Sequence, residues 1–176
     1  MDRRGFTIVE LLIVLVVIGT LLIMGVVNLR EAQANSRDTE RRSDVETIAS
    51  YLDTYYKTGY NYGTTTAGAY PSTYLTDPIG SGGGGVEYIK AVLVDVRESS
   101  LEAPSMINII DTFVSATNND QSTTGVTPQP TINQYVYQPI DKNGSLCMGT
   151  TECRSFNIFW RSEVDNSVYK VISKNQ

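Results

Sequence analysis

Glu10 is the side chain with the most unusual setting in this sequence. It is the one ionisable group in the apolar run from Phe6 to Val27. A carboxylate inside a lipid bilayer is costly and needs either a partner charge or a functional reason to be there. The plainer alternative is that Glu10 lies near the membrane interface and is simply hydrated.

The remaining reactive side chains do not point to an enzyme. The chain has no histidine, and its two cysteines, Cys147 and Cys153, are separated by five residues. This composition excludes histidine-dependent catalysis and the usual zinc sites, and the spacing differs from the Cys-x-x-Cys of redox motifs. No pair of nucleophile and base stands out, so we expect neither enzymatic activity nor a cofactor.

Two weaker patterns concern ligands. Asp141, Asn143 and Ser145 alternate around a glycine and could offer oxygens to calcium, but the twelve-residue EF-hand pattern is incomplete, which favours a plain turn. The net charge of −5 leaves no basic surplus for neutralising phosphates. Nucleic-acid binding is therefore not indicated.

The N-terminal region predicts a membrane segment. Residues 1–5 form a short basic leader, and about twenty apolar residues after it match the thickness of a hydrocarbon core. An ordinary secretory signal has a shorter apolar stretch, and the small residues of Ala32-Gln33-Ala34 lie too far beyond this one. Arg3 and Arg4 should hold the N-terminus in the cytoplasm, which places the body outside.

The segment Gly5-Phe6-Thr7-Ile8-Val9-Glu10-Leu11-Leu12 resembles the processing and assembly motif of type IV pilins and pseudopilins. The resemblance implies that a prepilin peptidase cuts between Gly5 and Phe6 and that the new Phe6 amine is N-methylated. Glu10 would then pair with the Phe6 amine of a neighbouring subunit in apolar surroundings, where an unpaired charge is costly. Glu10 is thus the expected assembly residue.

The pattern after Val27 stays helical but becomes amphipathic. Apolar residues recur at steps of three and four from Val45 to Tyr55 or Tyr56, so we expect one helix that ends near Lys57. Its polar face carries charge pairs at helical spacing, which we interpret as a solvated face: Asp38 with Arg42, Arg42 with Glu46, and Arg41 with Asp44.

The rest of the chain predicts a loop-rich head. Strand-like residues span 134–140, 155–162 and 168–173, which predicts a three-stranded antiparallel sheet against the helix. Residues 104–115 favour a helix, 86–98 a helix or a strand, and 116–134 an exposed loop. Cys147 and Cys153 lie between the first two strands, and outside the membrane a disulfide is their natural state.

The expected fold is therefore α+β and type IV pilin-like, a long N-terminal helix packed on a small C-terminal antiparallel β-sheet. We divide it into a leader, a transmembrane or filament-core helix, the amphipathic half of the same helix, and a globular head, at residues 1–5, 6–27, 28–57 and 58–176.

The expected function is that of a structural subunit of a type IV pilus. The resemblance implies related pilin subunits, a prepilin peptidase, an assembly ATPase and a platform protein as partners. The precursor would reside in the cytoplasmic membrane and the assembled subunit in an extracellular filament. The alternatives are a pseudopilin of a secretion system and, in a different class, an uncleaved single-pass membrane protein whose head binds a ligand.

Overall fold

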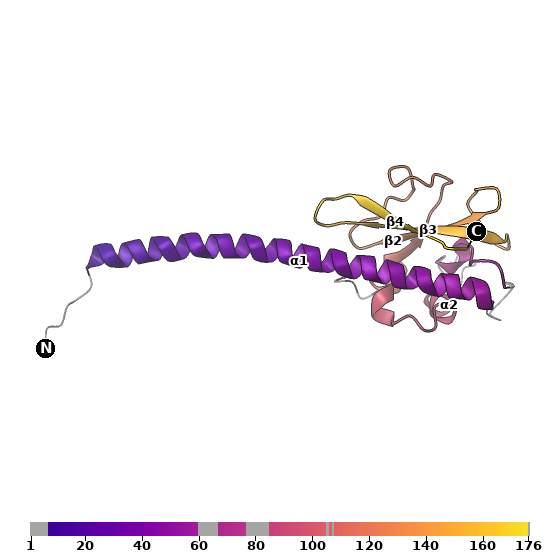
Figure 1. Cartoon of the computed structure of the whole chain (residues 1–176), viewed down its shortest axis with the longest axis horizontal. Coiled ribbons are helices and arrows are strands. Elements are labelled where there is room, and N and C mark those ends of the chain that lie inside the picture. Colours follow the sequence, from indigo (N-terminus) through magenta and orange to yellow (C-terminus); the bar gives the residue numbers. More distant parts are fainter. Residues whose placement is uncertain (1–6, 60–66, 77–84, 105, 107, 176) are drawn as a thin grey trace.

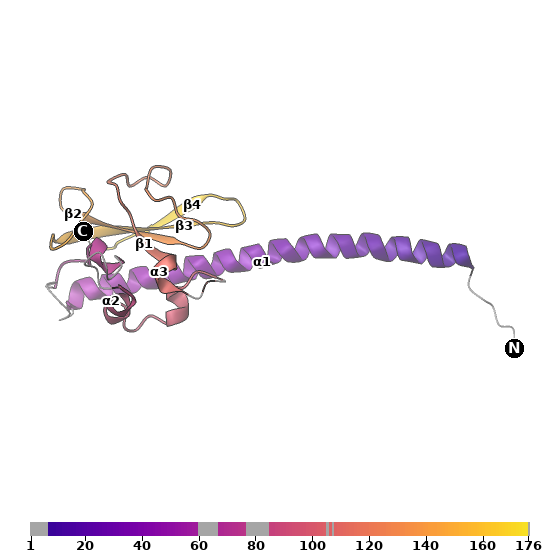
Figure 2. The same cartoon turned by 180° about the vertical axis from the view of Figure 1, so that it is seen from behind.

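A long helix carries a small α+β head on its C-terminal half (Figure 1). The computed structural model describes residues 7–59, 67–76, 85–104, 106 and 108–175 of the chain. Two views from opposite sides show the N-terminal half of α1 projecting beyond the head (Figures 1 and 2). The elements are α1 (Ile8–Thr58), η1 (Thr73–Leu75), α2 (Gly85–Val92), η3 (Glu98–Leu101), α3 (Ile109–Thr112), β1 (Phe113–Ser115), β2 (Tyr135–Asp141), β3 (Cys153–Arg161) and β4 (Val168–Ile172).

Helix α1 is continuous over 51 residues. At 1.5 Å per residue this length corresponds to about 77 Å, more than twice the thickness of a hydrocarbon core. Gly59 ends the helix at φ 58°, a backbone conformation that glycine adopts readily, and its N–H donates to the carbonyl of Tyr55. The prediction of a single helix ending near Lys57 is confirmed within the described residues.

The sheet has the order β1-β2-β3-β4. Strands β2, β3 and β4 pair antiparallel, as the sequence predicts, with Trp160 opposite Tyr169 and Val136 opposite Phe159. The fourth strand was not predicted: β1 pairs parallel to β2, with Phe113 opposite Tyr135. The sheet is therefore mixed and not wholly antiparallel.

Residues 104–115 do not form the single helix that their apolar spacing favoured. Among the described residues of this range, only the four of α3 are helical, and the chain then turns into β1. Phe113 is fully buried, and its ring lies 5.7 Å from that of Tyr137. Pairing with β2 and burial of this ring outweigh the local helical preference. Residues 86–98, left open between helix and strand, begin with α2.

The core lies on both faces of the sheet. The predicted stripe of α1, which includes Val45, Ile48 and Leu52, is buried against Tyr135, Tyr137, Phe156, Ile158 and Trp160 on one face. On the other face Val136 and Phe159 pack against Ala116 and Val126. The loop 116–134 was expected to be exposed, but these two buried side chains make it the cover of the outer face.

Candidate functional site

The projecting half of α1 is an exposed apolar surface. Its large hydrophobic side chains from Ile8 to Val26 are between 48% and 85% exposed. A helix that is apolar on all sides belongs in a membrane or against other apolar helices. By length and composition, α1 is long and apolar enough to cross a membrane.

Two glycines lie within this surface. Helix α1 runs unbroken through Gly19 and Gly25, and a Cβ built at either one meets nothing within 4 Å. Among the described residues of one subunit, the glycines therefore have no packing partner. They leave the backbone open to close approach by another helix, the use that small residues have at helix interfaces in membranes.

Thr7 and Glu10 form a capping box at the start of α1. The N–H of Thr7 donates to Glu10 Oε2 at 2.9 Å, and the N–H of Glu10 donates to Thr7 Oγ1 at 3.2 Å. These bonds satisfy N–H groups that have no partner within the helix. The pattern Thr-x-x-Glu before an apolar run could have signalled this cap. Gly5 and Phe6 lie outside the described residues, so cleavage, methylation and the pairing of Glu10 stay predictions.

A polar cluster joins the head to the middle of α1, and we call it the α1 clamp. It consists of Arg37, Asp38, Arg41, Ser162 and Glu163. Arg37 donates from Nε to Glu163 Oε2 at 2.8 Å and from Nη2 to Glu163 Oε1 at 2.5 Å. Asp38 accepts from Ser162 Oγ at 2.6 Å and from the N–H of Glu163 at 2.9 Å. The clamp thus joins α1 to the turn between β3 and β4.

Arg41 completes the clamp from the interior. It is only 1% exposed and donates to Asp38 Oδ1 at 2.7 Å and to the carbonyl of Ile132 at 2.8 Å. Burial of Asp38 alone would raise its pKa. Hydrogen bonds to the carboxylate outweigh this effect and hold the pKa of Asp38 below its usual value. The donors are the N–H groups of Glu163 and Val164 and the side chains of Ser162 and Arg41.

The prediction of a wholly solvated charged face on α1 is therefore wrong at Asp38 and Arg41. Asp38 bonds the β3–β4 turn and not Arg42, and Arg41 bonds Asp38 and Glu163 and not Asp44. The pair between Arg42 and Glu46 is present at 2.9 Å and is exposed. The spacing of charges along one helix carries no information about a turn more than 120 residues later.

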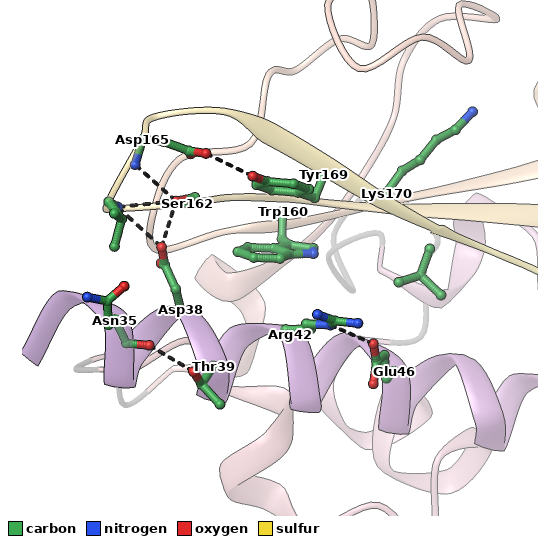
Figure 3. Close-up of a pocket in the computed structure, with 12 residues that line it drawn as sticks. Asn35, Asp38, Thr39, Arg42, Glu46, Trp160, Ser162, Asp165, Tyr169 and Lys170 are labelled. Atoms are coloured by element: carbon green, nitrogen blue, oxygen red, sulfur yellow. Dashed lines mark hydrogen bonds and ion pairs between the residues drawn. The ribbon is translucent and has the colours of Figure 1, made fainter. Parts of the chain in front are cut away.

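A groove of about 560 Å³ opens between α1 and the β3–β4 hairpin, beside the clamp (Figure 3). Trp160 stacks on Tyr169 with ring centroids 4.9 Å apart, and Tyr169 Oη donates to Asp165 Oδ2 at 2.8 Å. The N–H of Ser167, followed by the hydroxyls of Tyr169 and Ser162, lowers the pKa of Asp165 to about 2. Asp165 is therefore ionised and fixes the hairpin.

Asp44 is a titratable group in the head core. It is 6% exposed and accepts from Tyr135 Oη at 3.3 Å. Burial raises the pKa of Asp44 to about 6, Glu40 adds repulsion, and bonds from Ser100 and Tyr135 oppose the shift only in part. The head therefore contains a carboxylate that changes charge near neutral pH.

The predicted disulfide is present between Cys147 and Cys153. Both cysteines are fully buried, and the N–H of Tyr70 donates to the carbonyl of Cys153 at 2.9 Å. The loop that the disulfide closes presents Met148 at the surface. The bond thus fixes an exposed loop to the core beside the end of α1.

The calcium candidates form a hydrogen-bonded turn. Asp141 Oδ1 accepts from the N–H of Asn143 at 2.8 Å and from that of Ser145 at 2.9 Å, and Oδ2 accepts from Asn143 Nδ2 at 3.4 Å. These bonds, first that from Ser145, lower the pKa of Asp141. Across the described residues, no three His, Cys, Asp or Glu side chains gather as metal ligands would. The sequence favoured a plain turn here, with calcium binding as the weaker alternative, and these bonds describe such a turn.

Comparison with known proteins agrees with the N-terminal geometry. Residues 1–26 match the family model of the prokaryotic N-terminal methylation motif. No curated protein and no solved structure matches the chain. The motif points to a structural protein rather than an enzyme and, with the apolar helix, fits a membrane-anchored precursor. The chain carries, at residues 1–26, the class III signal peptide of type IV pilins and pseudopilins.

Proposed function

We propose that this protein is a structural subunit of an extracellular type IV pilus. The observation that carries the proposal is the methylation motif at residues 1–26, continued by a helix whose first half projects from the head and exposes apolar side chains on all sides. In the precursor this half is the membrane anchor. In the filament the same surface is buried against other copies of α1.

The position of the head leaves the N-terminal half of α1 available for contacts between subunits. The clamp lies in the middle of α1, and the large exposed apolar side chains before it, from Ile8 to Leu29, are available to pack along neighbouring helices. Contacts between different surfaces of successive copies generate helical filaments when the rotation does not close. Gly19 and Gly25 offer the open backbone that such packing uses.

The proposed maturation follows from the motif. A prepilin peptidase cuts between Gly5 and Phe6 on the cytoplasmic side, and the Phe6 amine is methylated. The positive leader keeps the N-terminus inside, and the head lies outside. An assembly ATPase and a platform protein then transfer the subunit from the membrane to the filament.

Glu10 then has two partners in turn. In the single subunit its carboxylate caps the helix through Thr7. In the filament it pairs with the cationic Phe6 amine of a neighbour, and this ion pair sets the register of successive subunits. An unpaired charge in the apolar filament core is costly, so subunits in the wrong register are disfavoured.

The methylation motif equally supports a second candidate, a pseudopilin that forms a short periplasmic assembly. The two candidates share cleavage, methylation and helix packing. They differ in whether the polymer extends beyond the cell surface or remains in the periplasm. Electron microscopy of cells with an antibody to the head separates them: long surface filaments support the pilus, and their absence from cells that contain the mature protein supports the pseudopilin.

Intact-mass spectrometry tests the class to which both candidates belong. Protein purified from membranes of its own host should begin at Phe6 and carry one added methyl group. A mature chain that begins at Met1 would overturn the proposal and would favour an uncleaved, membrane-anchored binding protein. A peptidase-deficient host is the control, and its chain should retain the leader.

A further inference from the structure

We propose that the head binds a tetrahedral oxyanion, of the phosphate or sulfate class, in a cavity above Arg161. The cavity has a volume of about 510 Å³ and lies between the end of β3, the start of β4 and the loop 116–134. We call it the Arg161 cavity. Arg161 is the one charged residue among the described residues that line it, and its polar neighbours there are uncharged: Thr123, Thr124, Gln129, Asn166 and Ser167.

The guanidinium of Arg161 is held in place by neutral acceptors. Its Nε donates to the carbonyl of Pro130 at 2.7 Å, and Nη1 donates to the carbonyl of Asn166 at 2.8 Å. Its Nη2 donates to Gln129 Oε1 at 3.2 Å, and among the described residues the second N–H of this nitrogen has no acceptor. The group is fixed in orientation, and its positive charge is not neutralised.

This setting distinguishes Arg161 from the other arginines that form side-chain bonds in the described part of the chain. Each of those arginines has a carboxylate within salt-bridge distance: Arg37, Arg41, Arg42 and Arg154. A partly buried guanidinium without a counter-ion is unfavourable, and its fork of donors matches oxyanions well. An anion in the cavity would supply the missing charge.

Lys170 adds a second cation on the same face of the sheet. It lies opposite Phe159 in the β3–β4 ladder, and Arg161 lies opposite Val168, which makes the two cations diagonal neighbours. Lys170 also lines the edge of the groove, and Figure 3 shows its side chain leaving β4 on the opposite side from Trp160. Its Nζ donates to the carbonyl of Gln121 at 3.0 Å, again a neutral acceptor.

The carboxylates of the flanking loops are bound elsewhere. Asp120 accepts from the N–H of Ser122 within its own loop. Asp165 accepts from Tyr169 beside the groove, and Glu163 belongs to the α1 clamp. Arg161 and several hydroxyls thus line the cavity, Lys170 lies near Arg161 on the same face of the sheet, and no carboxylate is bonded to either cation among the described residues. This combination selects a compact multivalent oxyanion over a neutral ligand.

Binding can be measured on the full chain in a non-ionic detergent by ¹H–¹⁵N NMR. The probes are inorganic phosphate, sulfate and glucose 1-phosphate at pH 7, with sodium chloride adjusted so that ionic strength stays constant. We expect saturable shifts in the amides of Thr123, Thr124, Arg161 and Ser167. Tighter binding of glucose 1-phosphate than of phosphate would identify a phosphorylated saccharide as the natural source, and equal binding would identify the free ion.

Substitutions locate the site. Arg161→Gln should weaken phosphate binding by at least about tenfold because it removes a charge-assisted donor, and Lys170→Gln should weaken it about threefold. Arg42→Gln, which removes one exposed cation elsewhere, should leave binding unchanged. If the Arg161→Gln variant no longer gives the dispersed spectrum of a folded head, the phosphate affinities of Lys170→Gln and Thr123→Val decide the test. The proposal is overturned if the amide shifts grow linearly with phosphate concentration, as nonspecific shifts with chloride would. It is also overturned if the Arg161, Lys170 and Thr123 variants bind phosphate as tightly as Arg42→Gln does.

Discussion

Arg41 Nη1 lies 2.7 Å from Asp38 Oδ1, one turn apart on α1, and this pair is closed over by the turn between β3 and β4. The pair joins the last exposed part of the helix to the head. Its loss exposes no large apolar surface, but it leaves the buried Arg41 with a weaker partner in Glu163 at 3.3 Å. The junction of helix and head therefore depends on polar contacts.

Asp38→Ala should lower the free energy of unfolding of the head by about 2–4 kcal/mol, because it removes the partner of a buried arginine and the acceptor of several N–H groups. Urea unfolding of the full chain in detergent measures this loss through the fluorescence of Trp160, the one tryptophan. Arg42→Gln, which breaks an exposed pair on the same helix, should leave the midpoint unchanged. An unchanged midpoint for Asp38→Ala would show that the clamp contributes nothing to stability.

Asp44 should make the head less stable as the pH rises from about 4 to about 6. Burial raises the pKa of Asp44 in the folded state to about 6, from an ordinary value of 3.8 for an aspartate in water. The folded state therefore retains its proton more strongly than the unfolded state, and the stability this provides is fully present below pH 4 and lost as the pH passes 6.

Asp44→Asn removes this titration. At pH 7 the variant should be more stable than the unchanged chain by up to about 3 kcal/mol, and the difference should vanish near pH 4. Urea midpoints measured at intervals from pH 4 to pH 8 test both statements. Asp165→Asn is the matched control, since Asp165 is already ionised over this range. Parallel pH profiles for Asp44→Asn and the unchanged chain would contradict the assignment.

Replacing both cysteines by serine should lower the free energy of unfolding by about 2 kcal/mol, the chain-entropy value for a loop this short. Tyr70 pairs with Cys153 through the backbone, so the exposed loop around Met148 should loosen together with the chain near Tyr70. Amide hydrogen exchange in these two segments measures the effect. If exchange becomes faster only in the loop around Met148, the disulfide acts on that loop alone.

The sequence predicted the parts of this fold that depend on local pattern. The stripe of Val45, Ile48 and Leu52 and the three antiparallel strands follow from periodicity, and the structure confirms them. Strand β1 was missed because Phe113 sits in a stretch with helical spacing, and only its partner Tyr135 decides its conformation. A single sequence does not show which distant residue will supply that partner.

The candidate site also has parts that the sequence predicts and parts that it does not. The apolar run and Glu10 are visible in the sequence because one charge stands out among neutral neighbours. The α1 clamp is not visible, since Arg37 and Glu163 are 126 residues apart and each alone is typical of a solvated surface. Arg161 is likewise ordinary in sequence and becomes distinctive only through the neutral acceptors that the fold places around it.

Glu10→Gln separates the two roles proposed for this residue. Glutamine at this position can still accept the N–H of Thr7, because capping boxes use Glu or Gln, so the helix start is retained. It cannot neutralise the amine of a neighbouring Phe6. If charge pairing governs assembly, the variant should be inserted and cleaved like the unchanged chain but should fail to form filaments.

The measurement compares cleaved subunit in the membrane with sheared filament from the cell surface. Glu10→Ala removes both the cap and the charge, whereas Thr7→Val weakens the cap and keeps the charge. We expect filaments from Thr7→Val and none from Glu10→Gln or Glu10→Ala. Filaments from Glu10→Gln in normal amount, together with none from Thr7→Val, would instead assign Glu10 to the helix cap and remove the ion pair from the assembly mechanism.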